Sequence, residues 1–143
     1  MGHSSESTKP CKDCVRDGVA TVRPAPHPGP RCATHHREVK RERRGKAHER
    51  AVGIRYGLGP GNYQRLQDFQ GGTCAGCQRA KGITKRLAVD HDHKTGEVRG
   101  LLCHNCNYTL AHFRDDPVAL RRLADYLENP PARRLGLGQL DES

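Results

Sequence analysis

The sequence has no tryptophan and only 4% aromatic residues, and residues 1–50 contain no Leu, Ile, Phe, Tyr or Trp. A segment so poor in large apolar side chains cannot bury enough surface to offset the conformational entropy that folding removes. Small proteins with weak cores usually depend on metal ions or disulfides for their stability. The seven cysteines of this 143-residue chain are therefore the first residues to explain.

Long apolar runs are also missing. Residues 1–10 are polar, unlike a secretory signal peptide, and no stretch approaches the length of a membrane span. These absences predict a cytoplasmic protein that is not secreted and has no membrane partner. In a reducing compartment, closely spaced cysteines bind metal more often than they form disulfides, and an odd number of cysteines fits poorly with complete disulfide pairing.

Acidic residues are too few to balance the basic ones, and the formal net charge is +9. Residues 1–70 hold 14 Lys and Arg against 7 Asp and Glu, whereas residues 71–143 hold 11 against 9. A small basic chain of this kind suggests a polyanionic partner, with nucleic acid as the leading candidate. A solvated charged surface is the alternative. The basic residues that we expect to contact DNA phosphates are Arg31, Lys40, Arg41, Arg43, Arg44, Lys85, Arg86 and Arg99.

Proline, glycine and charge patterns divide the chain into five segments. We predict a disordered tail at 1–9, a loop-rich Cys/His unit at 10–36, a basic helix or linker at 37–55, a domain at 56–129 and a flexible tail at 130–143. Within the domain, apolar spacing predicts a short amphipathic helix through Tyr63, Leu66 and Phe69, and a last helix that begins at Pro117. Between these helices we expect strands at 86–90 and 98–102 joined in a hairpin, and a helix from about 105 to 112.

Two sets of cysteines have the spacing of tetrahedral zinc sites. One combines two Cys-x-x-Cys pairs separated by 25 residues, Cys74, Cys77, Cys103 and Cys106. The other has a 17-residue gap between its halves and contains Cys11, Cys14, Cys32 and His35. His36 could replace His35 as a ligand, and His27 is a weaker contributor. Disulfides, or incidental cysteines in a Pro-rich arm, are the alternative interpretations.

An acid-histidine cluster, DHDH at 90–93, lies between the two cysteine pairs of the first set, and Asn107 directly follows Cys106. A zinc that joins these pairs would bring Asn107 close to the end of the first strand, where Asp90 lies. Carboxylate and amide oxygens are hard ligands that suit Mg²⁺. We therefore interpret Asp90 and Asn107 as candidate magnesium ligands.

The histidines of the cluster have roles in proton transfer or positioning. His91 could accept a proton from water at neutral pH, and His93 could orient a phosphate or a water. Asp92 is the weakest member. Each residue also has a purely structural interpretation, as an extra zinc ligand or a turn former. Taken together, they predict metal-assisted hydrolysis of a phosphodiester.

These motifs resemble the phage recombination endonuclease VII branch of the HNH, or ββα-metal, nucleases. The matching pieces lie between 56 and 127 and include GGTCAGC at 71–77, VDHDH at 89–93, TGEVRGLLC at 95–103 and CN at 106–107. The resemblance implies a small α+β, zinc-stapled fold with a treble-clef-like ββα-metal core and flanking helices. Residues 11–35 look like the extra Cys/His unit of some phage and actinobacterial members. Two positions depart from the pattern, because some members carry His at Ala88 and Gly at Ala111.

The resemblance also implies a chemistry. Asp90 and Asn107 would hold Mg²⁺, for which Mn²⁺ could substitute, His91 would be the general base and His93 an auxiliary residue. The implied protein is a DNA endonuclease with little sequence specificity, selective for branched or junction DNA, acting as a homodimer in a bacterial or phage-infected cell. A general HNH nicking enzyme and a non-catalytic two-zinc DNA-binding protein are the alternatives.

Overall fold

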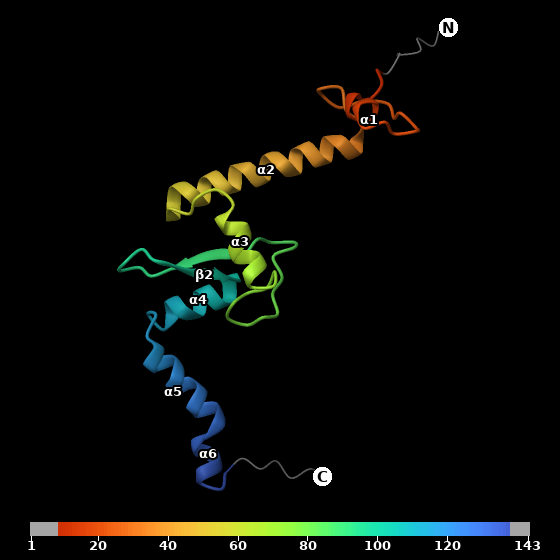
Figure 1. The fold of residues 1–143 in the computed structure, drawn as a ribbon. Helices are drawn as coiled ribbons and strands as arrows, with labels where there is room; N and C mark the ends of the chain where they lie inside the picture. Colours follow the sequence, from red (N-terminus) through yellow and green to blue (C-terminus); the bar gives the residue numbers. More distant parts are fainter. Residues whose placement is uncertain (1–8, 138–143) are drawn as a thin grey trace, which may run out of the picture. The chain divides into compact units, whose positions relative to one another are not determined.

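The computed structural model describes residues 9–137 of the chain (Figure 1). The chain divides into two compact units, 1–60 and 61–143. Among the described residues, no helix is both long and apolar enough to cross a lipid bilayer. Two parts of the predicted tails lie outside the described residues. They are 1–8 of the predicted tail at 1–9, and 138–143 of the predicted tail at 130–143.

The first unit consists of loops, a short helix α1 (Lys12–Arg16) and a long helix α2 (Ala33–Tyr56). The basic segment at 37–55, predicted as a helix or a linker, is therefore helical. Val52 is the buried residue of α2, because the sequence offers the helix almost no apolar face. Instead, the helix is stabilised by residues of high helix propensity and by i,i+4 ion pairs. In one such pair, Lys46 Nζ lies 2.7 Å from Glu42 Oε1. It ends at Gly57, which has a left-handed φ of 67°.

The second unit is built around a two-stranded antiparallel hairpin. The strands are β1 (Ala88–His91) and β2 (Val98–Leu102), close to the predicted positions. Helix α4 (His104–His112) follows directly and contacts both strands, and α3 (Asn62–Phe69) contacts β2. Figure 1 shows the hairpin between these two helices. The buried side chains that form its small core are Tyr63, Leu87, Val89, Leu101 and Leu102.

The prediction for α3 is confirmed in its position but wrong in its buried face. Tyr63 is buried and donates a hydrogen bond from its hydroxyl to the Leu87 carbonyl, 2.8 Å away. Phe69, in contrast, is 90% exposed. A spacing of three residues falls short of a full helical turn, so after two steps Phe69 has drifted about 120° from Tyr63.

A β-bulge interrupts the hairpin where the acid-histidine cluster lies. Asp90 pairs with Gly100, but the next residue, His91, pairs with Val98, so Arg99 is an extra residue on β2. An extra residue bends its strand and changes the direction of its side chain. The bulge therefore decides where Arg99 points.

The last helix, α5 (Pro117–Glu128), begins as predicted behind Asp116, whose side chain accepts a hydrogen bond from the Val118 N–H at 2.8 Å. None of its residues is buried, and Leu127 is 70% exposed. A further short helix, α6 (Pro131–Arg134), occupies part of the segment predicted as a flexible tail. Proline is favoured in the first turn of a helix, which explains why the two prolines at 130–131 initiate α6 rather than prevent it.

Gln70, just after α3, joins the loop before Cys74 to the hairpin. Its side-chain N–H groups donate to the carbonyls of Thr73 and Leu101, both at 2.9 Å, and its oxygen accepts from the Leu101 N–H at 2.8 Å. Leu101 is fully buried, and its carbonyl also accepts a hydrogen bond from the Ala75 N–H at 3.1 Å, so its N–H is the group that depends on Gln70.

We expect Gln70→Ala to lower the free energy of unfolding by about 2–3 kcal/mol, because it removes three hydrogen bonds and leaves the N–H of the buried Leu101 without its Gln70 partner. Gln64→Ala is the matched control, since Gln64 makes an exposed side-chain bond to Asp68. Urea unfolding of the full chain measures both. Equal stabilities for the two variants would contradict the role of Gln70.

Candidate metal centres and active site

The two Cys-x-x-Cys pairs of the second unit converge on one point. The ligand atoms of Cys74, Cys77, Cys103 and Cys106 all lie within 4.8 Å of one another. Cys77 Sγ and Cys103 Sγ are 4.0 Å apart, about twice the length of a disulfide bond, so this geometry is that of a metal site. Because Cys103 ends β2 and caps α4, an ion here would fix the hairpin to the helix.

The electrostatics of these four thiols fit a divalent cation. The backbone N–H groups of Ala80 and Arg79 lower the pKa of the Cys77 thiol to about 6. Burial, together with the neighbouring Cys103, raises the pKa of Cys106 to about 12. Four thiolates cannot share so small a space without a compensating positive charge. Zn²⁺ would supply that charge, and soft thiolates are its preferred ligands.

The Cys/His set of the first unit also forms a cluster able to hold zinc. His35 Nδ1 lies 3.3–3.4 Å from the sulfurs of Cys11, Cys14 and Cys32. Of the two histidines that the sequence left open, His35 is the one beside the three thiols, and its ligation of zinc stays a prediction. The ring of His36 instead stacks on that of His27, with centroids 4.5 Å apart.

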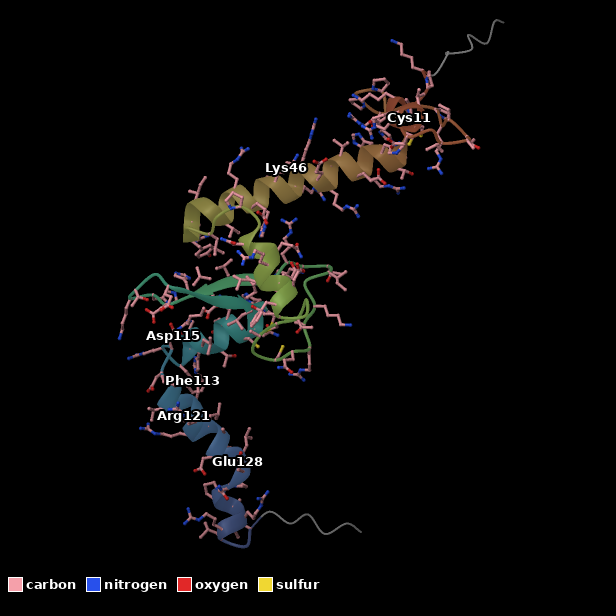
Figure 2. All side chains as sticks on the ribbon, in the orientation of Figure 1. Cys11, Lys46, Phe113, Asp115, Arg121 and Glu128 are labelled. Atoms are coloured by element: carbon pink, nitrogen blue, oxygen red, sulfur yellow. The ribbon has the colours of Figure 1, made fainter. Side chains whose placement is uncertain are left out.

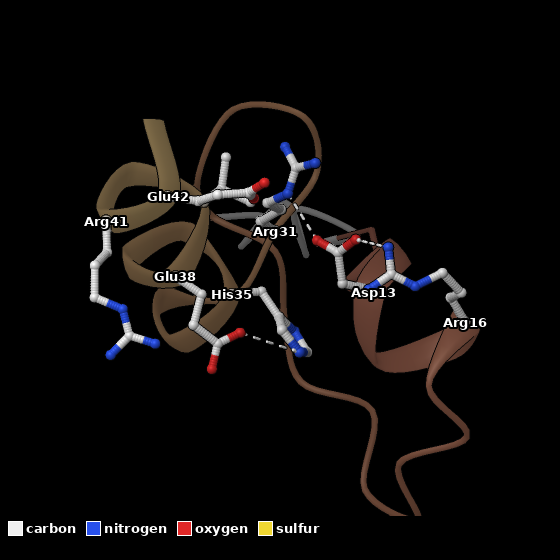
Figure 3. Close-up of a pocket in the computed structure, with 8 residues that line it drawn as sticks. Asp13, Arg16, Arg31, His35, Glu38, Arg41 and Glu42 are labelled. Carbon is white, nitrogen blue, oxygen red and sulfur yellow. Dashed lines mark hydrogen bonds and ion pairs between the residues drawn. The ribbon is translucent and has the colours of Figure 1, made fainter. Parts of the chain in front are cut away.

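Carboxylates surround the other nitrogen of His35. His35 Nε2 lies 3.5 Å from Asp17 and 3.9 Å from Glu38, the second of which is drawn in Figure 3. Metal-bound histidines usually donate their second N–H to a carboxylate, which fixes the orientation of the ring. Asp13, buried nearby, accepts from Arg31 at 2.7 Å and lies 3.1 Å from Arg16 (Figure 3).

Asp90 lies buried on β1 and is held by Arg99. Its two carboxylate oxygens accept hydrogen bonds from Arg99 Nε at 2.8 Å and Nη2 at 2.9 Å. This bidentate pair follows from the bulge, and it raises the pKa of Arg99. Sequence reasoning assigned Arg99 to the DNA backbone. Its guanidinium faces carboxylates here, and a phosphate contact by Arg99 stays a prediction.

Asp115 is a further member of this network that sequence reasoning missed. It lies in the segment between α4 and α5 (Figure 2), with Oδ1 3.2 Å from Arg99 Nη2 and Oδ2 3.2 Å from His93 Nδ1. The interaction with His93, followed by that with Arg99, lowers the pKa of Asp115. Arg114 and Asp115 both adopt positive φ, 53° and 55°, a conformation that costs non-glycine residues about 1–3 kcal/mol each. In the sequence, the only indication of Asp115 was its position directly before Asp116, the N-cap residue of α5.

The histidines of the cluster are adjacent in space, with the rings of His91 and His93 4.8 Å apart. Asp92 has the role of a turn former, the structural interpretation that the sequence also allowed. Its Oδ1 accepts hydrogen bonds from the N–H groups of Lys94 and Thr95, at 2.7 and 2.9 Å, and thereby forms the hairpin turn. These bonds lower the pKa of Asp92, the bond from Thr95 most of all.

Asn107 lies in α4 and lines a cavity of about 500 Å³. Ala88 lines the same cavity, and because side chains alternate along a strand, Asp90 projects from the same face of β1 as Ala88. The cavity therefore borders the hairpin through Ala88 and α4 through Asn107. The polar and basic residues around this cavity include Lys81, Lys85, Arg86, His104 and Asn105.

Comparison with known proteins identifies the family. The sequence profile described as recombination endonuclease VII matches residues 49–129. The chain belongs to the recombination endonuclease VII family. The Gene 59 proteins of Mycobacterium phages L5 and D29 are each 54% identical to it over 125 residues, which is 87% of this chain and 76% of theirs. No solved structure matches the chain.

Membership of the recombination endonuclease VII family indicates a nuclease that acts on DNA. The matched range contains the four-cysteine centre, the bulged hairpin, Asn107 and Asp115. The Cys/His cluster of the first unit lies before residue 49, outside the family profile. This endonuclease VII relative therefore carries a second metal-binding cluster in addition to the family domain.

We expect the purified chain to contain two zinc ions, and Cys106→Ser to contain one. Loss of the second-unit zinc should lower the thermal midpoint markedly, because that core is small. Elemental analysis and thermal unfolding measure these effects, and Cys14→Ser is the matched control for the other cluster. Unchanged metal content in both variants would exclude the zinc sites.

We expect Asp115→Asn to slow cleavage of supercoiled DNA by roughly tenfold, because it removes the charge that orients Arg99 and His93. The neighbouring Asp116→Asn is the control, since Asn is also a good N-cap and should leave the rate unchanged. Plasmid nicking rates provide the comparison. Equal rates for the two variants would show that the Asp115 network is irrelevant to cleavage.

Proposed function

We propose that this protein is a magnesium-dependent HNH endonuclease with a ββα-metal core, which hydrolyses phosphodiester bonds of branched DNA with little sequence specificity. The observation that carries the proposal is the bulged hairpin, which presents Asp90 and His91 beside α4 and is joined to it by the four-cysteine centre. The other ligand candidate, Asn107, directly follows Cys106 of that centre on α4.

The donor set fits a hard cation. Asp90 and Asn107 would hold Mg²⁺, which when bound neutralises charge on the phosphate and on the leaving oxygen. Arg99 donates one hydrogen bond to each Asp90 oxygen, so each oxygen keeps a lone pair for a metal. Arg99 in this role fixes the direction of the carboxylate.

His91 is the general base in this proposal. It ends β1 next to the buried Asp90, and its neighbour His93 is held by Asp115. His91 would take the proton of the attacking water, while His93 would orient the phosphate or the water. Neither residue needs to recognise a base.

Basic residues beside the proposed active site explain the low sequence specificity. Lys85 and Arg86 line the cavity that contains Asn107. Contacts of Lys and Arg with phosphates position DNA but carry no sequence information. Selectivity for branched DNA would come from the shape of the DNA, and a homodimer would match the symmetry of a four-way junction. The exposed apolar residues of α5, including Leu123 and Leu127, support such a dimer.

A non-catalytic two-zinc DNA-binding protein is the second candidate. The bidentate Arg99–Asp90 pair favours it, because a guanidinium already satisfies much of the carboxylate. A general nicking enzyme is a third, favoured by Ala88 at a position where some members carry His. Cleavage assays separate these three functions.

We expect the wild-type chain to cut a four-way junction faster than linear duplex in Mg²⁺, and His91→Ala to lose at least about 100-fold in rate while it still binds both DNAs. His112→Ala, an exposed histidine at the end of α4, is the matched control. Gel-based cleavage with and without chelator, together with anisotropy binding, measures each quantity.

The outcomes assign the function. Tight binding with no cleavage in Mg²⁺ or Mn²⁺ would establish the DNA-binding alternative. Equal rates on junction and duplex would establish the general nicking enzyme. Wild-type cleavage by His91→Ala would refute the general base, and unchanged Mg²⁺ titrations of Asp90→Ala and Asn107→Ala would refute the metal ligands.

A further inference from the structure

We propose that the first unit contains a separate phosphate-binding pocket for the DNA backbone. This pocket, called here the cationic pocket, has a volume of about 350 Å³ and is lined by Pro28, Gly29, Arg31, His36, Val39, Lys40 and Arg43. The inference rests on the proposed function, because it names DNA as the ligand. The inference goes beyond the proposed function because it assigns DNA binding to a group of residues outside the catalytic unit.

The charge of the cationic pocket is unbalanced. Its lining contains three cationic side chains and no carboxylate. Among the described residues, Lys40 and Arg43 form no ion pair with an acidic side chain. The neighbouring cavity in Figure 3 differs, because Asp13, Glu38 and Glu42 line it together with basic residues. An anion is therefore favoured in the cationic pocket and not in its neighbour.

A tight turn fixes Arg31 in the pocket wall. His27 and Arg31 exchange backbone hydrogen bonds of 3.2 and 3.1 Å across the turn, and Gly29 has a φ of +85°. A Cβ at position 29 would lie 2.5 Å from Arg31 Nη1, so the turn requires glycine for its conformation and for space. Arg31 Nε is bound to Asp13, which leaves the terminal nitrogens for a ligand.

Helix α2 supplies the opposite wall. His36, Lys40 and Arg43 follow the i, i+4, i+7 spacing that places side chains on one helix face. His36 stacks on His27, which joins the helix to the turn. The turn leads directly into Cys32 and the helix begins at the next residue, so the Cys/His cluster holds both walls together.

The chemistry of these walls identifies the ligand. Guanidinium and ammonium groups converging from a turn and a helix suit a phosphate, and the DNA backbone presents phosphates at every nucleotide. A binding site on the same chain as a nuclease raises the effective concentration of DNA at the catalytic unit. The cationic pocket should thus contribute to affinity and not to the chemical step.

The test compares two double variants that remove the same charge from the same helix. Lys40→Gln with Arg43→Gln removes cations of the pocket, whereas Arg37→Gln with Arg55→Gln removes two exposed cations of α2 that do not line it. Affinity for a duplex of 30 base pairs is measured by anisotropy without added Mg²⁺ or Mn²⁺, between 50 and 200 mM KCl. Zinc content and thermal midpoint confirm that each variant is folded.

We expect the pocket pair to weaken binding by roughly tenfold and to reduce the slope of log affinity against log salt by roughly two, since each lost phosphate contact removes about 0.9. The control pair should weaken binding by no more than about twofold. Equal losses for the two pairs would overturn the cationic pocket. Because binding is measured without divalent ions, failure of the wild type to cut DNA would refute the proposed function alone.

Discussion

The gathering of four thiols within 4.8 Å is the constraint on which the second unit depends. Its apolar core is a handful of side chains on one hairpin and one helix, too few to fix the angle between α4 and the strands. Cys103 directly follows β2 and is the N-cap of α4, so an ion bound at this point would fix where the helix starts and therefore where Asn107 lies. Metal binding here is part of folding, and the proposed chemistry depends on it.

The first unit also contains a cluster of metal-ligating side chains, and this cluster positions basic residues. Its long helix has almost no apolar face, and packing alone could not hold the loops that precede it. The Cys/His cluster joins those loops to the start of α2, with His35 as its fourth member. As a result, basic residues far apart in the sequence, such as Arg31 and Arg43, line one pocket. Zinc bound at this cluster would position basic side chains as well as compensate for the missing apolar core.

Between the two strands, a bulge links the local backbone to the electrostatics of the site. One extra residue on β2 directs Arg99 to Asp90, and a strained turn after α4 directs Asp115 to Arg99 and His93. β-Bulges and strained backbone of this kind are over-represented at functional sites. The cluster of alternating acids and histidines is therefore not a set of equivalent side chains. Asp92 forms the turn, Asp90 is buried, and His93 is held from outside the hairpin.

The sequence by itself determined the features that depend on local spacing. Apolar periodicity and capping residues located the hairpin, α3 and α5, and the Cys-x-x-Cys intervals identified both metal clusters, because such patterns act over a few residues or through ligand chemistry. Only the tertiary structure decided between His35 and His36, revealed Asp115, turned Arg99 towards Asp90, and left Phe69 and the apolar side of α5 exposed. Those outcomes depend on which segments meet in space, and contacts between distant segments leave no periodic trace in the sequence.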